Sequence, residues 1–273
     1  MVNDEPTSSI IKGFKDYISS ESPSEYDEFV KNIIDISSLN VTLGSTQVLT
    51  DLSLQIPAGQ WCCLVGPSGC GKSTLLRAVA GLVPSESESF KTGFETPAFV
   101  FQDATLMPWR NVHDNVRLPL ELRDPVAENS SDTTIIETIR QVGLAEADKD
   151  KFPRELSGGM RMRVSMARAL VTKPDMMFMD EPFAALDELL RQQLNQLIHE
   201  ICRQQQVTMM FVTHNVSEAV YLSDRILVMN RYGDIKQDVS IKLPEERNPE
   251  LRASSEYLQA VAEVSSFLQE SLV

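Results

Sequence analysis

The stretch Gly66-Pro67-Ser68-Gly69-Cys70-Gly71-Lys72-Ser73-Thr74 lies between an apolar run, residues 61–65, and a segment of helical composition, residues 75–80. Strand, glycine loop and helix in this order form the setting in which G-x-x-x-x-G-K-[ST] binds phosphate. The glycines let the backbone wrap closely, so that N–H groups and the start of the helix point at phosphate oxygens. Lys72 would neutralise the β- and γ-phosphates, and the Ser73 hydroxyl would ligate Mg²⁺. We therefore predict a nucleotide-binding loop rather than a glycine-rich turn with a surface lysine.

The bulk composition is that of a globular chain with a strong acidic balance. Its 273 residues are 42% hydrophobic and 23% charged, which suits one large domain or two small ones. A net charge of −14 and a pI near 4.7 disfavour nucleic acid or an anionic membrane surface as the main partner. The longest uninterrupted apolar run, residues 61–65, is far shorter than the roughly 18 residues of a membrane helix. The N-terminus lacks a signal-peptide core, so we expect any membrane role to come through a partner.

The four cysteines show no metal-ligand spacing. They are Cys62, Cys63, Cys70 and Cys202. Cys62 and Cys63 are adjacent on a predicted buried strand, where successive side chains point to opposite faces. We expect reduced, structural thiols of a cytosolic protein.

Downstream of the glycine loop the sequence alternates between strand-like and helical stretches. We expect strands over residues 98–101, 176–179, 207–213, 225–229 and 235–243, and helices over residues 133–142, 156–171, 188–204, 215–223 and 254–268. This alternation predicts an α/β fold with a mainly parallel sheet and ligands at the carboxyl ends of its strands.

Before and between these stretches the pattern differs. Residues 33–43 and 47–56 are typical of two antiparallel strands joined at residues 44–46. Residues 112–150 are mostly helical, with breaks expected near Pro119 and Pro125. The chain thus divides into an acidic, loosely ordered extension (1–33), a nucleotide-binding domain (34–243) with a helical part at about 103–172, and a short helical tail (244–273).

A second constellation follows a strand of four apolar residues. Residues 176–179 lead directly into Asp180 and Glu181. Phosphoryl transfer to water needs charge neutralisation at the phosphates and an oriented attacking water. Asp180 fits the Mg²⁺ role, and Glu181 fits the base that orients the water. Alone, such a pair is more often an exposed turn, but together with the glycine loop it indicates nucleotide hydrolysis.

From residue 34 to residue 243 the chain resembles the ATP-binding subunit of an ABC transporter, because six short motifs occur in that family's order. They are the Walker A loop (66–74), the Q-loop glutamine Gln102, the signature Leu156-Ser157-Gly158-Gly159, the Walker B strand ending at Asp180 with catalytic Glu181, the D-loop Ala184-Ala185-Leu186-Asp187, and the switch histidine His214. The resemblance implies a P-loop NTPase fold with an N-terminal antiparallel β part and a helical subdomain.

The resemblance also implies composite active sites that use ATP and Mg²⁺. Ser157, Gly158 and Gly159 would grip the γ-phosphate of an ATP held by the opposite subunit, so that two ATPs are sandwiched in a homodimer. His214 would contact the γ-phosphate, and Gln102 would touch Mg²⁺ or the attacking water. Asp187 would lie across the dimer interface. The alternatives are a buried, hydrogen-bonded histidine at position 214 and a surface amide at position 102.

Three departures from the family pattern are visible. Met160 follows the signature where glutamine is usual. Leu43 precedes Gly44 where the family usually places an aromatic ring on adenine, so the grip on adenine would be weaker by about 1 kcal/mol. The segment between Lys72 and Gln102 is short, so the antiparallel hairpin that often sits there would be trimmed.

The motif surroundings point to a branch of the family. Residues 102–109, which include Pro108-Trp109, and the sequence LSGGMR at 156–161 are similar to nitrate/sulfonate/taurine-type importers, with carriers of pyrimidine vitamin precursors as relatives. The surface at 102–110 would receive a helix of the membrane subunit, although Pro108-Trp109 could instead be a rigid turn and packing anchor. The chain ends soon after the core, so we expect no large C-terminal regulatory domain.

The resemblance implies a peripheral position on the inner face of the cell membrane. The implied partners are a second copy of the chain, two membrane-spanning permease subunits and, indirectly, an extracytoplasmic solute-binding protein, with no nucleic acid. Two alternative functions are that of a non-transport ABC ATPase and that of a degenerate regulatory subunit. A single motif set without a heptad run disfavours the first, and intact Lys72, Asp180, Glu181 and His214 disfavour the second.

Overall fold

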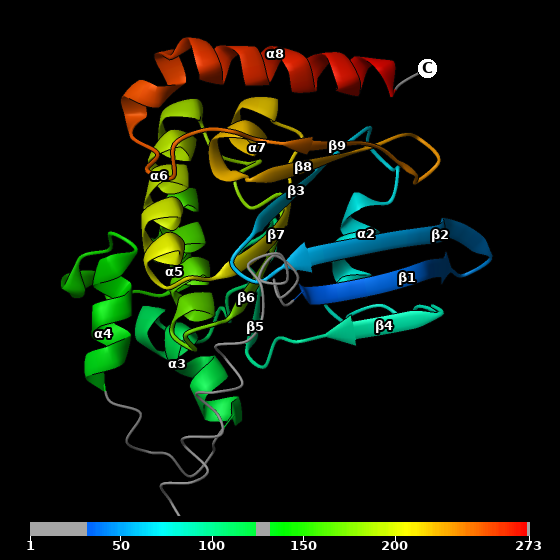
Figure 1. The fold of residues 1–273 in the computed structure, drawn as a ribbon. Helices are drawn as coiled ribbons and strands as arrows, with labels where there is room; N and C mark the ends of the chain where they lie inside the picture. Colours follow the sequence, from blue (N-terminus) through cyan, green and yellow to red (C-terminus); the bar gives the residue numbers. More distant parts are fainter. Residues whose placement is uncertain (1–31, 124–131, 272–273) are drawn as a thin grey trace, which may run out of the picture. The chain divides into compact units, whose positions relative to one another are not determined.

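The computed structural model describes residues 32–123 and 132–271 (Figure 1). The expected extension at residues 1–33 therefore lies outside the described residues except for its last two, which begin the first strand. The break expected near Pro125 also lies outside them.

A small antiparallel sheet begins the described chain. It contains β1 (Asn32–Leu43), β2 (Thr46–Pro57) and β4 (Ser89–Thr92), in the order β2-β1-β4. Along β2 the side chains of Leu52, Leu54 and Ile56 are buried while their neighbours are exposed, so the strand is half-buried as its alternation predicts. The short segment after the glycine loop helix supplies one strand of four residues, β4, to this sheet.

The main sheet has the order β5-β6-β7-β3-β8-β9 within the residues that the structure describes. Its strands are β3 (Trp61–Val65), β5 (Pro97–Val100), β6 (Met176–Asp180), β7 (Thr208–Val212), β8 (Arg225–Met229) and β9 (Ile235–Ser240). Every pairing is parallel except that of β9 with β8. Strands buried on both faces are continuous apolar runs, as in β3 and β6. The expected fold class is confirmed.

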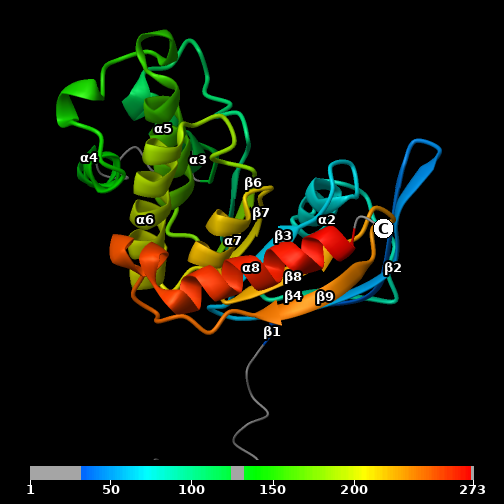
Figure 2. The same ribbon diagram turned by 90° about the horizontal axis from the view of Figure 1, so that it is seen from above.

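Helices cover both faces of this sheet. They are α2 (Lys72–Val79), α3 (Val112–Arg123), α4 (Asp132–Gln141), α5 (Gly158–Leu170), α6 (Glu188–Gln204), α7 (Val216–Leu222) and α8 (Ser255–Glu270), with single turns η2 (Glu146–Asp148), η3 (Pro153–Glu155) and η4 (Pro249–Ala253). In both views α2 lies beside β1, β2 and β4, whereas α3 to α6 gather on the opposite side (Figures 1 and 2).

Two hydrophobic cores result, one on each side of the main sheet. The side chain of Cys62 belongs to the core under α2 and the antiparallel sheet, and that of Cys63 belongs to the core under α5 to α8. The adjacent thiols therefore point to opposite faces, as predicted. All four cysteines are free and buried.

The expectation of a helix break at Pro119 is wrong. Pro119 lies inside α3, which runs unbroken from Val112 to Arg123. Proline cannot donate to the Asn115 carbonyl, and a proline in a helix interior costs about 3 kcal/mol. Complete burial of Val112 and Val116 in the helical core offsets this cost.

Candidate nucleotide site

The glycine loop leaves the carboxyl end of β3, which lies between β7 and β8, and opens α2. Two of its glycines are required by close approach. A Cβ atom on Gly66 would lie 2.6 Å from the Met229 carbonyl oxygen. Gly71 has a φ of 104°, and a Cβ there would lie 2.9 Å from the Leu49 side chain. The loop therefore needs glycine at these two positions.

Lys72 lies at the centre of the loop. Its ammonium group donates to the Gly66 carbonyl at 2.9 Å and to the Pro67 carbonyl at 2.7 Å, and the residue is only 6% exposed. The ammonium also contacts the Cys70 sulfur at 3.9 Å. A buried ammonium whose partners are two neutral carbonyls and a thiol is well placed to exchange them for phosphate oxygens, because hydrogen bonds to charged acceptors are stronger.

Ser73 and Asp180 meet beside the loop. The Ser73 hydroxyl donates to Asp180 Oδ1 at 2.6 Å, and Arg77 Nη2 pairs with Asp180 Oδ2 at 2.8 Å. A hydroxyl and a carboxylate in contact are oxygen donors of the kind that Mg²⁺ prefers, so these two residues fit the ion. Arg77 was not predicted as a site residue, although its position four residues after Ser73 places both on one face of α2.

Glu181 and His214 lie side by side at the ends of β6 and β7. His214 Nδ1 is 3.1 Å from Glu181 Oε2. Glu181 has a φ of 48°, and its N–H donates to the Val212 carbonyl at 3.0 Å. A left-handed backbone is uncommon at a residue with a side chain and turns the chain sharply at the strand end. The side chain of His214 is 57% exposed, so the alternative of a buried histidine is wrong.

A pocket of 360 Å³ lies between the glycine loop and Glu181. Its lining is Leu43, Val48, Ser68, Gly69, Gly71, Lys72, Ser73, Thr74 and Glu181. Leu43 is 45% exposed and lines the pocket. Gln102 is exposed and lies two residues beyond Val100, which pairs with Met179 in the neighbouring strand. Gln102 does not line the pocket.

The signature residues lie elsewhere. The Ser157 hydroxyl caps α5 by accepting from the Met160 N–H at 3.2 Å. A Cβ on Gly159 would lie 2.4 Å from the end of the Leu190 side chain, so a larger residue there would have to displace that side chain. Asp187 caps α6 by accepting from the Leu190 N–H at 3.0 Å. Ser157, Gly158, Gly159 and Asp187 are absent from the lining of the described pocket, so one chain does not assemble all the predicted site residues around it.

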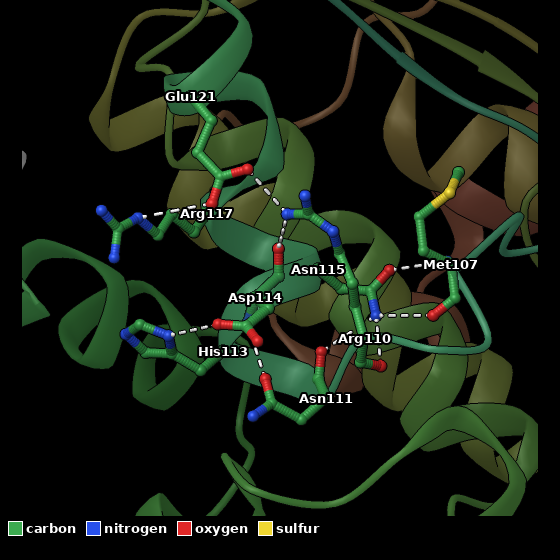
Figure 3. A network of polar contacts seen from close by, with 8 residues as sticks. All are labelled: Met107, Arg110, Asn111, His113, Asp114, Asn115, Arg117 and Glu121. Atoms are coloured by element: carbon green, nitrogen blue, oxygen red, sulfur yellow. Dashed lines mark hydrogen bonds and ion pairs between the residues drawn. The ribbon is translucent and has the colours of Figure 1, made fainter. Parts of the chain in front are cut away.

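The segment before α3 is held by a polar network (Figure 3). Asn115 is fully buried, accepts from the Met107 N–H at 2.8 Å and donates to the carbonyls of Arg110 and Asn111 at 2.9 Å. Arg110 also pairs with Glu121 at 2.7 Å. Trp109 on this rigid turn is 72% exposed, so its interpretation as a packing anchor is wrong.

An apolar groove of 390 Å³ lies next to this turn. Its lining includes Phe99, Phe101, Met107, Leu118 and Leu122. Within residues 32–123 and 132–271, the structure holds no helix whose length and apolar character would suffice to cross a membrane.

A glycine loop that opens a helix, beside a strand ending in Asp-Glu on a mainly parallel sheet, defines a P-loop nucleoside triphosphatase. A model of the ABC transporter family matches residues 49–184. Together with the relatives described next, this match shows that the chain belongs to the ATP-binding proteins of that family.

The relatives include the aliphatic sulfonates import ATP-binding protein SsuB of Zymomonas mobilis, which is 42% identical over 221 residues, 78% of this chain and 88% of the relative. An uncharacterized ABC transporter ATP-binding protein of Methanocaldococcus jannaschii is 39% identical over 252 residues, 89% of this chain and 92% of the relative. A solved ATP-binding cassette, dimeric and bound to ADP and Pi, shares the fold with a TM-score of 0.68 and 26% identity, covering 77% of this chain and all of the other. The resemblance drawn from the sequence is confirmed, and the chain is an ATPase of this family.

Proposed function

We propose that this chain is the ATP-hydrolysing subunit of an ABC importer, working as a homodimer that sandwiches two ATPs beneath two permease subunits. The observation that carries the proposal is the incomplete pocket. It contains the glycine loop and Glu181, whereas the capped N-terminus of α5 with its free N–H groups lies outside it. A second copy could supply that helix end to the γ-phosphate, as the dimeric form of the solved relative suggests.

Each residue of the pocket has a distinct chemical task in this proposal. The Ser73 hydroxyl and the Asp180 carboxylate would hold Mg²⁺, with Gln102 as a further ligand or a ligand of the attacking water. The ion, when bound, neutralises charge on the phosphate oxygens. Lys72 would bind the β- and γ-phosphates. Glu181 would accept a proton from the attacking water, and the contact with His214 holds this carboxylate at the strand end.

A complementation experiment tests the composite site. Lys72→Ala removes the phosphate cation and Ser157→Arg blocks the signature helix, so each variant alone should be inactive. A one-to-one mixture should recover about a quarter of the wild-type activity, because half of the dimers are mixed and each mixed dimer holds one intact site. The control is a mixture of Lys72→Ala with Glu181→Gln. Lys72 and Glu181 of one subunit belong to the same half-site, so every site in this mixture lacks one of the two and no activity should be recovered. Recovery in the control, or none in the test mixture, would contradict the proposal.

The membrane partner would dock on the groove beside Trp109. The groove is apolar, and Leu122, one of its lining residues, is 75% exposed. Trp109 follows the lining residue Met107 by two positions and is 72% exposed. Exposed tryptophans on rigid supports are typical binding hot spots, because little side-chain entropy is lost when they are buried. An amphipathic helix from the cytoplasmic side of each permease subunit fits this chemistry. Through this groove the chain would be held at the inner face of the membrane.

The transported solute is proposed from the relatives. Several relatives at about 40% identity are named aliphatic sulfonates import ATP-binding proteins, so we propose a small organosulfonate as cargo. Nitrate, taurine and a pyrimidine vitamin precursor are competing cargoes of the same branch. In vesicles, the chain assembled with its permease subunits should hydrolyse ATP faster when the solute-binding protein carries an alkanesulfonate. If ATP hydrolysis is stimulated only by nitrate, taurine or the vitamin precursor, that solute would be the cargo and the sulfonate assignment would be wrong.

A further inference from the structure

A buried carboxyl lies under the loop that carries His214. Glu218 is in the first turn of α7, four residues after His214, and is only 2% exposed. Burial raises the pKa of this carboxyl to about 7, because an ionised carboxylate loses its hydration there. Glu218 therefore changes its charge near neutral pH, although it does not line the nucleotide pocket.

Several elements bring polar or charged groups to Glu218. The Thr213 hydroxyl at the end of β7 hydrogen-bonds with its carboxyl. The other charged or titratable groups that face it are Cys63 on β3, Glu188 and Arg191 on α6, and Arg252 on η4. The two arginines favour the charged carboxylate, and Glu188 opposes it.

On one side Glu218 is connected to the histidine loop, residues 213–215. The Thr213 hydroxyl accepts from the Asn215 N–H at 3.1 Å, which spans His214. The Asn215 side chain in turn accepts from the Glu218 N–H at 3.0 Å. Both neighbours of His214 are thus hydrogen-bonded to Glu218, Thr213 through its hydroxyl and Asn215 through its side chain. The His214 imidazole itself contacts Glu181.

On the other side Glu218 faces Arg191, which holds the loop that follows Glu181. The Arg191 guanidinium donates to the Leu186 carbonyl at 2.9 Å and to the Phe183 carbonyl at 3.4 Å. It also pairs with Glu188 at 2.9 Å. The charge of Glu218 interacts electrostatically with Arg191 and therefore influences the segment from Glu181 to Asp187 that Arg191 holds.

We propose that Glu218 is a positioning residue for ATP hydrolysis, whose buried carboxylate sets His214 through the Thr213 hydroxyl and steadies the 182–187 loop through Arg191. This inference rests on the proposed active site and adds to it a residue that the nucleotide does not touch. It concerns the geometry of the Glu181–His214 pair and leaves nucleotide binding to the glycine loop.

The charged form is the productive one. A carboxylate only accepts hydrogen bonds, so it directs the Thr213 O–H toward itself and leaves the oxygen lone pairs for the Asn215 N–H. A protonated carboxyl can donate to the same Thr213 oxygen and competes with the Asn215 N–H. Protonation also removes the negative charge that faces Arg191. Turnover should therefore rise with pH as Glu218 loses its proton.

The first experiment separates positioning from folding. Glu218→Met fills the same buried space without a charge and should be at least as stable as the parent. Its kcat should nevertheless fall about tenfold, with KM for ATP and ATP-dependent dimerisation unchanged. Thr213→Val, which removes the intermediate hydroxyl, should have a similar effect, and the two losses should not add in the double variant. Ser223→Ala, equally buried at the other end of α7, is the matched control and should retain full kcat.

The second experiment follows the proton. Arg252→Gln removes a cation that faces Glu218, so its pKa should rise and the kcat–pH profile should move to higher pH. When Glu218 is already replaced by glutamine, Arg252→Gln should not shift the kcat–pH profile, because glutamine does not ionise. Other titrating groups cancel in this comparison, because they are common to both backgrounds.

Full kcat in Glu218→Met, or an equal movement of the profile in both backgrounds, would overturn the inference. His214→Ala tests the active site separately. If His214→Ala is inactive while Glu218→Met is fully active, the inference fails and the proposed function stands. If His214→Ala is fully active, the assigned role of the histidine fails, and with it the basis of this inference.

Discussion

Replacing Glu218 by glutamine should change the way in which the stability of the folded protein depends on pH. Burial raises the pKa of the Glu218 carboxyl from 4.5 to about 7. Between these values the folded protein retains a proton that the unfolded chain has released. The stability that this proton contributes is fully present below about pH 4.5 and is lost as the pH rises through about 7. Glutamine does not ionise, so the variant should not show this loss.

The size of the effect follows from the two pKa values. Each unit of difference corresponds to about 1.4 kcal/mol, so the full loss for one carboxyl is about 3 kcal/mol. The residue is 2% exposed, so solvent screening reduces this value little. Relative to the parent, Glu218→Gln should therefore be more stable at pH 8 than at pH 5 by about this amount.

Denaturant unfolding of both proteins at half-unit steps from pH 5 to pH 8 measures the prediction. The informative quantity is the difference between the two unfolding free energies at each pH, because the contributions of other groups cancel in it. Ser223→Ala serves as the control and should run parallel to the parent. Parallel curves for Glu218→Gln and the parent would show that the buried carboxyl keeps an ordinary pKa, and the reasoning would be refuted.

Three further substitutions test the site. Leu43→Tyr should tighten ATP binding about fivefold by offering an aromatic face to adenine, and an unchanged Kd in a nucleotide titration would show that this position does not meet the base. Gly159→Ala should cost about 1 kcal/mol of stability and weaken ATP-dependent dimerisation, because its methyl group displaces the Leu190 side chain. Light scattering measures the fraction of dimer, and an unchanged fraction would contradict the close contact. Trp109→Ala should leave the basal ATPase rate of the isolated chain unchanged but reduce solute-stimulated turnover of the assembled importer at least tenfold, and equal stimulation would place the permease contact elsewhere.

Local chemistry in the sequence was enough to predict much of the fold. The glycine loop, the strand ending in Asp180-Glu181 and the start of the helix expected over residues 156–171 each depend on residues within a few positions of one another. The opposite orientation of Cys62 and Cys63 needs only the two-residue period of a strand. Such features depend little on the rest of the chain, and the structure reproduces them.

Contacts between distant segments were harder to predict. The contact of His214 with Glu181 depends on the parallel register of β6 and β7, which no local pattern encodes. It was not predicted, because the family resemblance implied only that His214 contacts the γ-phosphate. Pro119 shows the opposite failure, because a reliable local rule was overridden by burial of the surrounding helix. Glu218 was missed because one glutamate before a short apolar run gives no indication of how deeply it is buried.

The adjacent thiols on β3 have a practical consequence. Cys62 and Cys63 occupy different hydrophobic layers, and burial raises the pKa of Cys62 to about 12 and that of Cys63 well above its usual range. Neither thiol should react with an alkylating reagent until its own layer opens. Pulse alkylation followed by mass spectrometry can therefore report, from two neighbouring residues of one peptide, which side of the sheet separates first when the protein unfolds.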